Sequence, residues 1–364
     1  MNRIAAEDLE GFAAALFEAA GVRSTDAAQV AESLVAADLR GHNTHGTFRV
    51  PWYIDGFKEM DWIDPRGDPE IVAESPVTAV VDANRIFGQV AGRVAVDTAI
   101  EKARESGVGI VGVRDATHLG RIGEWAERAA DAGCLSMFQV ATQGGSTTVG
   151  PAGSADRIWS TNPMTWGVPT FGALEFPIVL DMATSQVAHG KIRTRAKAGE
   201  PIPEGWTTDE HGEPATDAVA FEDEAEGALL PLGGRTAGYK GFGMALMSEL
   251  FSGIIGDGFV SGQQDLPRSQ NIGAMHVIDP TCFTESAAIV DRVAALTDLI
   301  RSADYSDDIP VGVGAKEGRG LLPGEPEHRY YVDRVENGIP LEAETREALR
   351  ERAIEYGIED EIPY

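Results

Sequence analysis

The spacing of apolar residues predicts amphipathic helices towards both ends of the chain. Leu9, Phe12 and Leu16 recur every three or four residues, as on one face of a helix, and Gly21 follows where that helix should end. The same spacing recurs further on, with Ser24 or Thr25 as the N-cap of the next helix. The terminal helices predicted in this way cover residues 6–20, 24–40, 284–303 and 342–356.

Between these ends, short apolar runs alternate with helical segments. Runs such as VTAVVDA and GIVGVRD are rich in β-branched residues and are bounded by turns, which is typical of buried strands. Because strands and helices alternate, we expect an α/β fold. The predicted strands lie at 77–83, 109–115, 135–141, 177–183 and 273–280, and the helices at 89–105, 124–132, 185–199 and 238–258; residues 51–76, 199–227 and 312–329 read as loops.

Residues 107–112, GVGIVG, match the glycine pattern of dinucleotide-binding loops. Such a loop must follow a strand and open a helix, so that its free amides meet the pyrophosphate. Here the glycines follow a predicted helix and lie inside a predicted strand. We therefore interpret them as a tight helix-to-strand turn, and a nucleotide must be held by another arrangement.

The chain is strongly acidic, with 58 Asp and Glu residues against 30 Lys and Arg and a formal net charge of −28. Such a surface repels phosphate backbones and anionic lipids, which argues against nucleic-acid and membrane partners. Only six of the basic residues are lysine, and dissolved salt would screen the repulsion among so many acids. We therefore expect a protein adapted to molar salt.

Two cysteines, Cys134 and Cys282, cannot form a disulfide framework. No apolar run is long enough to span a membrane, and the N-terminal residues lack the basic and apolar segments of a signal peptide. HExxH, paired CxxC and EF-hand motifs are absent, so we expect no metal site. These observations favour a reduced, cytoplasmic protein.

The segment RGHNTHGTFR at 40–49 gathers cationic and proton-exchanging side chains at a predicted helix exit. His45 can exchange a proton near neutral pH, and Arg49 offers a planar fork that matches a carboxylate. With Thr44 beside them, these groups suit proton transfer on a small carboxylic acid. The alternative is that Arg40 and His42 only complement the helix C-terminus and that the rest is solvated loop.

A further histidine, His118, lies in the loop between a predicted strand and a predicted helix. The scaffold fixes such loops while leaving them reachable, which favours a catalytic role, and capping of the helix is the alternative. The backbone amides of residues 122–124 could receive a phosphate.

Turn chemistry explains Asn162, whereas Asp181 at a strand end should need a partner. These residues alone do not indicate hydride transfer.

Six segments, taken in order, resemble the malate/L-lactate dehydrogenase family, which includes ureidoglycolate and sulfolactate dehydrogenases. RGHNTHGTFR is similar to the family's RGxxSHGxxR segment. The resemblance implies a non-Rossmann fold, in which a large mixed sheet with flanking helices binds NAD or NADP, and a homodimer or higher homo-oligomer. The other segments are THLGRIG, TNPMTWGVP, LDMATSQVAHGK, YKGFGMALM and PGEPEHR.

The resemblance also implies roles for individual residues. His118 matches the family's acid/base histidine, and His45 matches the histidine of the Ser-His pair that supports it. The serine position is Thr44 here, which keeps the hydroxyl but stiffens it at χ1. Arg49 matches the arginine that holds the substrate carboxylate. The positions that match cofactor contacts are Thr142, Asp181, Met182, Ala183, Lys240, Gly324 and Glu325.

On this resemblance we expect an NAD(P)-dependent oxidoreductase that interconverts a small 2-hydroxy acid and its 2-oxo acid. Reduction of a cyclic imino acid is one alternative, and a non-catalytic small-acid binding protein on the same scaffold is another. A second cation (Arg40, Arg121 or Arg193) would favour a dianionic substrate. We place a mainly helical lobe with the substrate loop at 1–72 and 285–364, and the NAD(P)-binding domain at 73–284.

Overall fold

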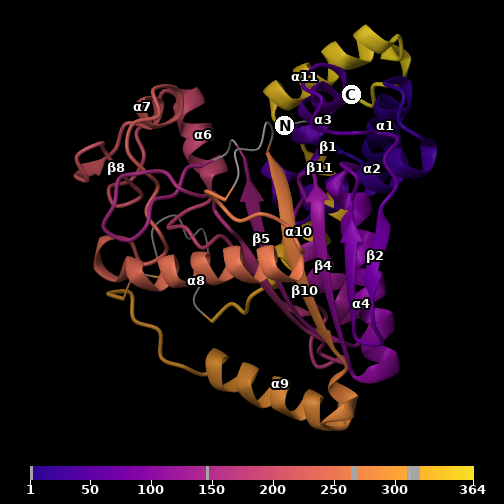
Figure 1. Cartoon of the computed structure of the whole chain (residues 1–364), viewed down its shortest axis with the longest axis vertical. Coiled ribbons are helices and arrows are strands. Elements are labelled where there is room, and N and C mark those ends of the chain that lie inside the picture. The colour runs from indigo at the N-terminus through magenta and orange to yellow at the C-terminus, as the bar shows by residue number, and fades with distance from the viewer. Residues whose placement is uncertain (1–2, 145–146, 264–268, 310, 312–319) are drawn as a thin grey trace.

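A seven-stranded sheet forms the centre of the computed structural model, which describes residues 3–144, 147–263, 269–309, 311 and 320–364 (Figure 1). The strand order is β2-β3-β4-β10-β5-β6-β7. Only β3 and β4 run parallel, so the predicted mixed α/β fold is confirmed. The strands are β2 Glu70–Glu74, β3 Thr78–Asp82, β4 Val108–Ala116, β5 Leu135–Gln143, β6 Met164–Val168, β7 Ile178–Met182 and β10 Gln270–Ile278.

Helices cover both faces of this sheet, and glycines on β4 let them approach closely. Helices α4 (Gly88–Ser106) and α5 (Gly123–Asp131) pack on one face and α8 (Gly234–Ile255) on the other. A Cβ at Gly109 would lie 2.1 Å from the Ala99 carbonyl oxygen in α4, and one at Gly112 would lie 2.0 Å from that of Ile255 in α8. The glycine run thus serves helix–sheet packing, and its interpretation as a helix-to-strand turn is confirmed.

The two ends of the chain meet at one end of the molecule (Figure 1). Strand β1 pairs antiparallel with β11, and helix α11 packs on α1 and α3. Helix α9 lies at the opposite end of Figure 1, away from the other terminal helices. The domain limits at 72 and 285 therefore stay a prediction. The elements are β1 Arg3–Ile4, α1 Ala6–Ala19, α2 Ser24–Leu39, α3 Val50–Lys58, α9 Ser286–Arg301, α10 Glu325–Asn337, β11 Ile339–Pro340 and α11 Ala343–Tyr356.

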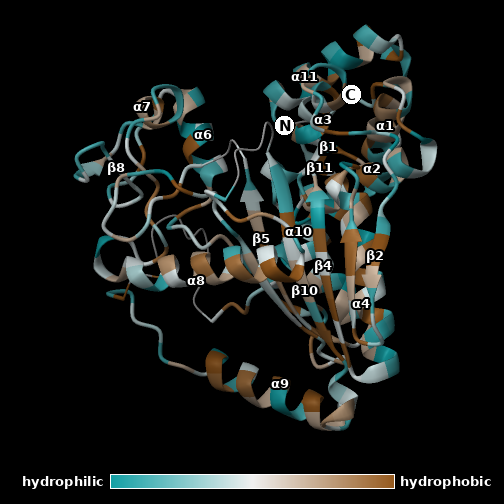
Figure 2. Cartoon of the chain, in the orientation of Figure 1, coloured by the Kyte–Doolittle hydropathy of each residue, from teal (hydrophilic) through white to brown (hydrophobic). Residues whose placement is uncertain are grey.

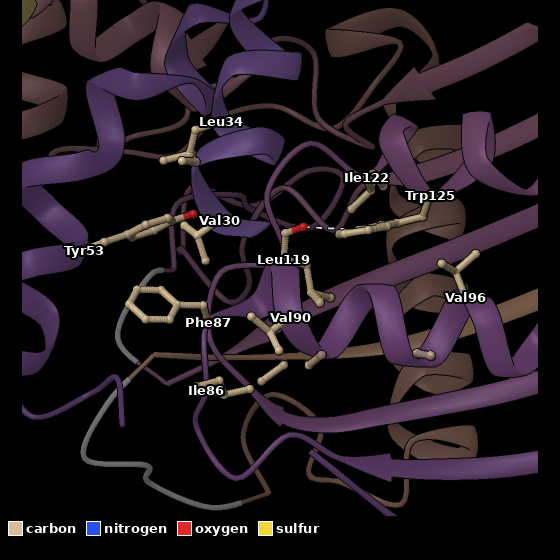
Figure 3. Packing of buried hydrophobic residues seen from close by; sticks show 14 of the residues in the cluster. Val30, Leu34, Tyr53, Ile86, Phe87, Val90, Val96, Leu119, Ile122 and Trp125 are labelled. Atoms are coloured by element: carbon tan, nitrogen blue, oxygen red, sulfur yellow. Dashed lines mark hydrogen bonds between the residues drawn. The ribbon is translucent and has the colours of Figure 1, made fainter. Parts of the chain in front are cut away.

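Two clusters of buried apolar side chains hold the fold together. The larger one joins the terminal helices to the sheet, so that Phe17 of α1 packs edge-on against Phe87 and Trp125 lies in the same core (Figure 3). The smaller cluster includes Trp159 and Phe221. The short helices α6 (His189–Ala198) and α7 (Ala218–Asp223) contribute side chains to it. Figure 2 shows apolar residues along the central strands and polar residues on outer helices such as α11.

Prolines conceal two helices from the sequence reading. Helix α3 lies in the stretch predicted to be irregular. Helix α10 begins inside the stretch 312–329 predicted as loop, of which 312–319 fall outside the described residues, and extends to Asn337. In both helices a proline occupies the first turn, where its missing N–H has no intrahelical partner to lose. Strands β2 and β6 were not predicted either; β2 is exposed along its whole length, so it lacks the pattern of a buried strand.

Other predictions need correction in detail. The residue preceding α2 is Arg23, and neither Ser24 nor Thr25 caps the helix. Strand β7 was expected to be buried, but it lies at the edge of the sheet with only Val179 buried. Asn162 does more than form a turn: it is fully buried with φ of 34°, and its amide donates to Glu249 at 2.6 Å.

Candidate active site

The loop that carries the first candidate residues leaves α2 through Gly41 and forms two single 3₁₀ turns. Gly41 has φ of 83°, a backbone conformation that favours glycine, and a Cβ there would lie 2.7 Å from the Tyr330 ring of α10. Arg334, also of α10, donates to the Asn43 side chain at 2.8 Å. Helix α10 therefore holds the start of the loop. The two turns are Asn43–His45 and Thr47–Arg49.

A buried carboxylate, Asp38, anchors the middle of the same loop. Its Oδ2 accepts hydrogen bonds from the Thr47 backbone N–H at 2.9 Å and from the Thr47 hydroxyl at 2.6 Å. Burial raises the pKa of Asp38 to about 6, although the bonds from Thr47 oppose that rise. A Cβ at Gly46 would lie 1.9 Å from Asp38 Oδ1, so the loop can reach this carboxylate only with glycine at that position.

The anchored loop presents Thr44, His45 and Arg49 together. The Thr44 hydroxyl lies 3.1 Å from His45 Nδ1, and Arg49 Nε donates to the Thr44 carbonyl oxygen at 2.7 Å. The methyl group that distinguishes Thr44 from serine faces Gly190 at the start of α6, where a Cβ would lie 3.3 Å away. The absence of a side chain at Gly190 thus leaves space for this methyl group.

His118 joins this group from the loop between β4 and α5. Its ring stacks on that of His45, with centroids 5.5 Å apart and planes 25° apart. Trp52 of α3 contacts Arg49 and His118. The Arg49 guanidinium lies 4.9 Å from the Trp52 ring centroid, and the Trp52 and His118 rings meet edge to face with centroids 5.9 Å apart. The structure therefore brings together the four residues to which the sequence reading assigned catalysis and substrate binding.

Two residues behind His118 were missed by the sequence reading. The Tyr53 hydroxyl lies 2.7 Å from His118 Nδ1, and the Gln89 side-chain amide donates to the same hydroxyl at 2.7 Å. Both side chains are fully buried. The available signal was the spacing of Tyr53 four residues after Arg49, which places the two side chains near one another where α3 begins.

Burial and positive charge keep both histidines neutral. Burial and the charge of Arg49 lower the pKa of His118 to about 3. Burial lowers the pKa of His45 well below its usual value, with further contributions from His118 and Arg49. Burial also lowers the pKa of Arg49, and it raises that of Tyr53 to about 12. The site thus combines neutral imidazoles and a neutral phenol with one guanidinium, and both rings keep some solvent-accessible surface.

Two of the predicted cofactor positions border the His118 loop. Asn271 of β10 links Thr142 to that loop, because its Nδ2 donates to the Thr142 hydroxyl at 3.0 Å and its Oδ1 accepts from the Leu119 N–H at 3.0 Å. Asp181 finds the partner that the sequence required: its Oδ2 accepts from the Gly123 N–H at 2.8 Å. This carboxylate occupies the start of α5, so the prediction that the amides of 122–124 receive a phosphate is wrong.

The remaining cofactor positions lie on separate elements. Met182 ends β7 and Ala183 follows it, while Lys240 is exposed on α8. Gly324 packs against β7, where a Cβ would lie 2.8 Å from the Pro177 carbonyl oxygen. Glu325 opens α10 and is bound by Arg329 at 2.9 Å. No contact in the described structure joins Lys240, Gly324 or Glu325 to the two histidines.

The chemistry at these positions fits a nicotinamide dinucleotide. The Thr142 oxygen accepts from Asn271 and keeps its own hydrogen to donate, as a carboxamide oxygen would require. Lys240 is exposed and forms no ion pair with the described carboxylates, so its ammonium group suits a pyrophosphate. Thr142 and Lys240 are therefore the candidate contacts for the cofactor.

In the described structure, no metal site, second ligand groove or membrane span adds to the histidine site. Among the described residues, no group of three or more His, Cys, Asp or Glu side chains could hold a metal ion. A groove of about 380 Å³ between α2, α4 and α5 is lined by charged side chains that already pair with one another, as Arg93 does with Glu32 at 2.6 Å and Arg128 with Asp97 at 2.5 Å. It lies apart from the histidines. In the part of the chain that the structure describes, no helix has the length and apolarity to cross a membrane.

Several known proteins are similar to this chain in sequence and in structure. A sequence profile of the malate/L-lactate dehydrogenase family matches residues 4–350. A malate dehydrogenase from Pyrococcus abyssi is 34% identical over 362 residues, which cover 98% of this chain and 95% of the relative. The structure of sulfolactate dehydrogenase from Methanocaldococcus jannaschii matches with a TM-score of 0.84 and 31% identity over 99% of both chains. That of Δ1-piperideine-2-carboxylate reductase from Pseudomonas syringae pv. tomato gives 0.82 and 28% over 97% of this chain and 100% of that one.

Proposed function

The chain belongs to the malate/L-lactate dehydrogenase family of oxidoreductases, and on that premise we propose that it interconverts a small 2-hydroxy acid and its 2-oxo acid with NAD or NADP. The observation that carries the proposal is the placement of Arg49 beside two stacked neutral histidines, His45 and His118. In this proposal Arg49 binds the carboxylate, His118 transfers the proton and His45 positions His118. The cofactor supplies the hydride when bound, with Thr142 and Lys240 as its contacts.

Arg49 binds the substrate carboxylate in this proposal. Its Nε is held by the Thr44 carbonyl oxygen and its plane by Trp52, which leaves the two terminal nitrogens of the guanidinium for a carboxylate. Burial of the guanidinium strengthens such a pair, because the local dielectric is low. The carboxylate thereby fixes the position of the keto carbon.

His118 exchanges the proton with the substrate oxygen. In the reductive direction it enters the step protonated and ends neutral, and the binding of an anionic substrate favours the protonated form against the charge of Arg49. His45 stacks on its ring and Thr44 binds His45, so both position the acid without donating the proton themselves. The Thr44 hydroxyl retains the function of the family's serine.

The three arginines that could bind a second acid group differ in how firmly they are already paired. Glu127 already pairs with Arg40 at 2.8 Å and with Arg121 at 2.5 Å. Arg193 on α6 lies 3.7 Å from Glu222, is half exposed, and its positive charge adds to the lowering of the Arg49 pKa. Arg193 is therefore the least firmly paired of the three arginines, and we propose that it favours a dicarboxylic or sulfonated substrate.

We predict that Arg193→Met raises KM about 10-fold for a dicarboxylic 2-oxo acid and leaves KM for a monocarboxylic one unchanged, because one charged hydrogen bond is lost. Arg195→Met is the matched control, since Arg195 lies on the same helix and donates to the Pro201 carbonyl oxygen instead. An equal effect of Arg193→Met on both substrates would contradict the assignment.

The function is tested by following NADH and NADPH oxidation in molar KCl against a panel of 2-oxo acids and cyclic imines. Turnover of a 2-oxo acid supports the proposal. Turnover of cyclic imines alone would favour the second candidate, imine reduction, which the likeness to Δ1-piperideine-2-carboxylate reductase motivates. Cofactor binding without turnover of any compound would point to a small-acid binding protein instead. Lys240→Ala should weaken cofactor binding in each case.

We further propose a cytoplasmic homodimer. Large apolar side chains are exposed along α8 and α9, including Phe251, Ile254 and Leu299, and a second copy of the chain would cover them. Light scattering in molar KCl tests the assembly, and a monomer at micromolar concentration would contradict it.

A further inference from the structure

A chain of three hydrogen-bonding groups runs from α4 to the ring of His118. The Gln89 side-chain amide, the Tyr53 hydroxyl and His118 Nδ1 are joined by two contacts of 2.7 Å each. Gln89 and Tyr53 have no more than 1% of their surface exposed. Figure 3 shows the Tyr53 ring among the apolar residues of the larger core, near Phe87. Bulk water therefore cannot substitute for either contact.

The direction of these bonds fixes the tautomer of His118. Gln89 Nε2 can only donate, so the Tyr53 oxygen accepts from it. A buried O–H without an acceptor is costly, so the Tyr53 O–H points to His118 Nδ1 and that nitrogen accepts. A neutral ring that accepts at Nδ1 carries its hydrogen on Nε2. In this arrangement Nε2 of His118 can donate a hydrogen bond to a substrate. It cannot take up a proton, because it already carries a hydrogen, and Nδ1 is occupied by the Tyr53 O–H.

The oxygen of the Gln89 side-chain amide allows a second arrangement of these hydrogen bonds. Gln89 Oε1 is buried and has no hydrogen-bond partner in the described structure. If the amide rotates by half a turn, Oε1 accepts from the Tyr53 O–H and the Tyr53 oxygen becomes an acceptor for Nδ1–H of His118. The Nε2 atom of His118 is then free to accept a proton from a substrate hydroxyl group. In the imidazolium form, the same atom can return the proton to a substrate oxyanion.

We propose that Gln89 is a positioning residue that, through Tyr53, switches His118 between a resting tautomer with the hydrogen on Nε2 and a working tautomer with the hydrogen on Nδ1. The proposal rests on the proposed function only in giving His118 the proton-transfer role. During reduction one proton leaves Nε2 of the imidazolium for the substrate oxygen, and Nδ1–H stays bound to Tyr53. The change of tautomer passes through the imidazolium: Nδ1 takes up a proton and Nε2 releases one, both exchanged with solvent, so that Gln89 and Tyr53 have no net gain or loss of a proton.

The other ionisable groups around His118 are few, which makes the switch measurable. Arg49 and the ring of His45 face it from the loop, and Tyr53 faces it from α3. Glu124 acts on Tyr53 from α5. Replacing Gln89 leaves Arg49, His45 and Glu124 in place and alters only the hydrogen bond at Tyr53, and the tautomer separates the effect of the amide from that of an added charge.

The test is the NMR titration of His118 in the full-length protein without substrate, with the imidazole ¹⁵N shifts reporting the tautomer and His118→Asn identifying the signal. Gln89→Glu offers a carboxylate that accepts the Tyr53 O–H, so it should place the hydrogen on Nδ1 and raise the pKa of His118 by about 1 unit or more. Gln89→Met removes the acceptor of the working state, so the hydrogen should stay on Nε2 and the pKa should fall. Tyr53→Phe should abolish the difference between the two Gln89 variants.

Gln29→Met is the matched control, because Gln29 is a neighbouring glutamine that donates only to the Gln89 carbonyl oxygen. It should leave the tautomer and the pKa of His118 as in the wild type. If Gln89→Glu and Gln89→Met shift His118 equally, or not at all, Gln89 is merely structural and the proposal is wrong. These outcomes do not depend on turnover, so they are separate from the failure of the proposed function. With an active substrate, the pH profile of kcat/KM should follow the same order.

Discussion

At the scale of single residues, the site consists of neutral groups gathered around one guanidinium. His45 and His118 stack within reach of Arg49, and the core and that positive charge keep both rings unprotonated. The sequence identified these residues because their types and their placement in loops are informative. It missed Tyr53 and Gln89, since a tyrosine and a glutamine within helices carry no mark of function until the fold places them behind a histidine.

The depressed pKa of His118 predicts how stability depends on pH. The unfolded histidine titrates near 6.5 and the folded one near 3, so the unfolded state binds a proton first as the pH falls. The contribution is fully present above 6.5 and is lost between 6.5 and 3. From pH 6.5 to pH 5 the wild type should lose about 1 kcal/mol more unfolding free energy than His118→Asn, a figure reduced because the ring is partly accessible.

Denaturant unfolding at the two pH values measures this difference. Asp38, whose pKa is raised and whose effect has the opposite sign, is common to both proteins and cancels. Equal losses in the wild type and in His118→Asn would show that His118 is protonated as readily in the folded as in the unfolded state.

At the scale of elements, the site depends on how α2, α3 and α10 hold one short loop. The terminal helices could be predicted from apolar spacing because each buries one face, and the central strands because helices cover both of their faces and leave short apolar runs. Helices α3 and α10 could not, because Pro51 and Pro326 resemble loop signals although both fit the first turn of a helix. Nor could spacing reveal that Asp38 of α2 binds the loop, since that contact joins residues nine apart across a turn.

Gly46 tests this loop with a minimal change. Its φ is −90°, which alanine adopts freely, but a Cβ there would lie 1.9 Å from Asp38 Oδ1. Gly46→Ala should therefore displace the loop, lower kcat/KM about 10-fold or more and cost about 1–3 kcal/mol of unfolding free energy. Gly11→Ala on α1, where no atom lies within 4 Å, is the control and should retain full activity. Full activity of Gly46→Ala would refute the role of Asp38 as the anchor.

At the scale of the whole molecule, the excess of acidic residues dominates. Many arginines are already paired with carboxylates, as Arg114 is with Asp82 at 2.8 Å. Acidic residues nevertheless outnumber basic ones by 58 to 30, and this excess gives the chain its net charge of −28. The sequence could predict this character because charge is a sum over residues. It could not predict that helix α9 lies apart from the other terminal helices, because its amphipathic pattern does not say which surface it covers.

We predict that the melting temperature rises by about 5–10 °C between 0.1 M and 2 M KCl, because the screening length falls from about 10 Å to less than 3 Å. Differential scanning fluorimetry measures the change. A nonionic osmolyte at the same osmolality is the control and should give a smaller rise. Maximal stability in dilute buffer would contradict the expected adaptation to salt.

The most direct test of the central claim compares a 2-oxo acid with its uncharged amide in the wild type and in Arg49→Met. If Arg49 binds the carboxylate beside His118, the wild type should prefer the acid in kcat/KM by about 100-fold, as expected for a buried, charge-assisted pair of hydrogen bonds. Arg49→Met should lose most of that preference by losing activity on the acid alone. An Arg49→Met enzyme that still prefers the acid by the wild-type ratio would show that the carboxylate is bound elsewhere and that the assignment of this site is wrong.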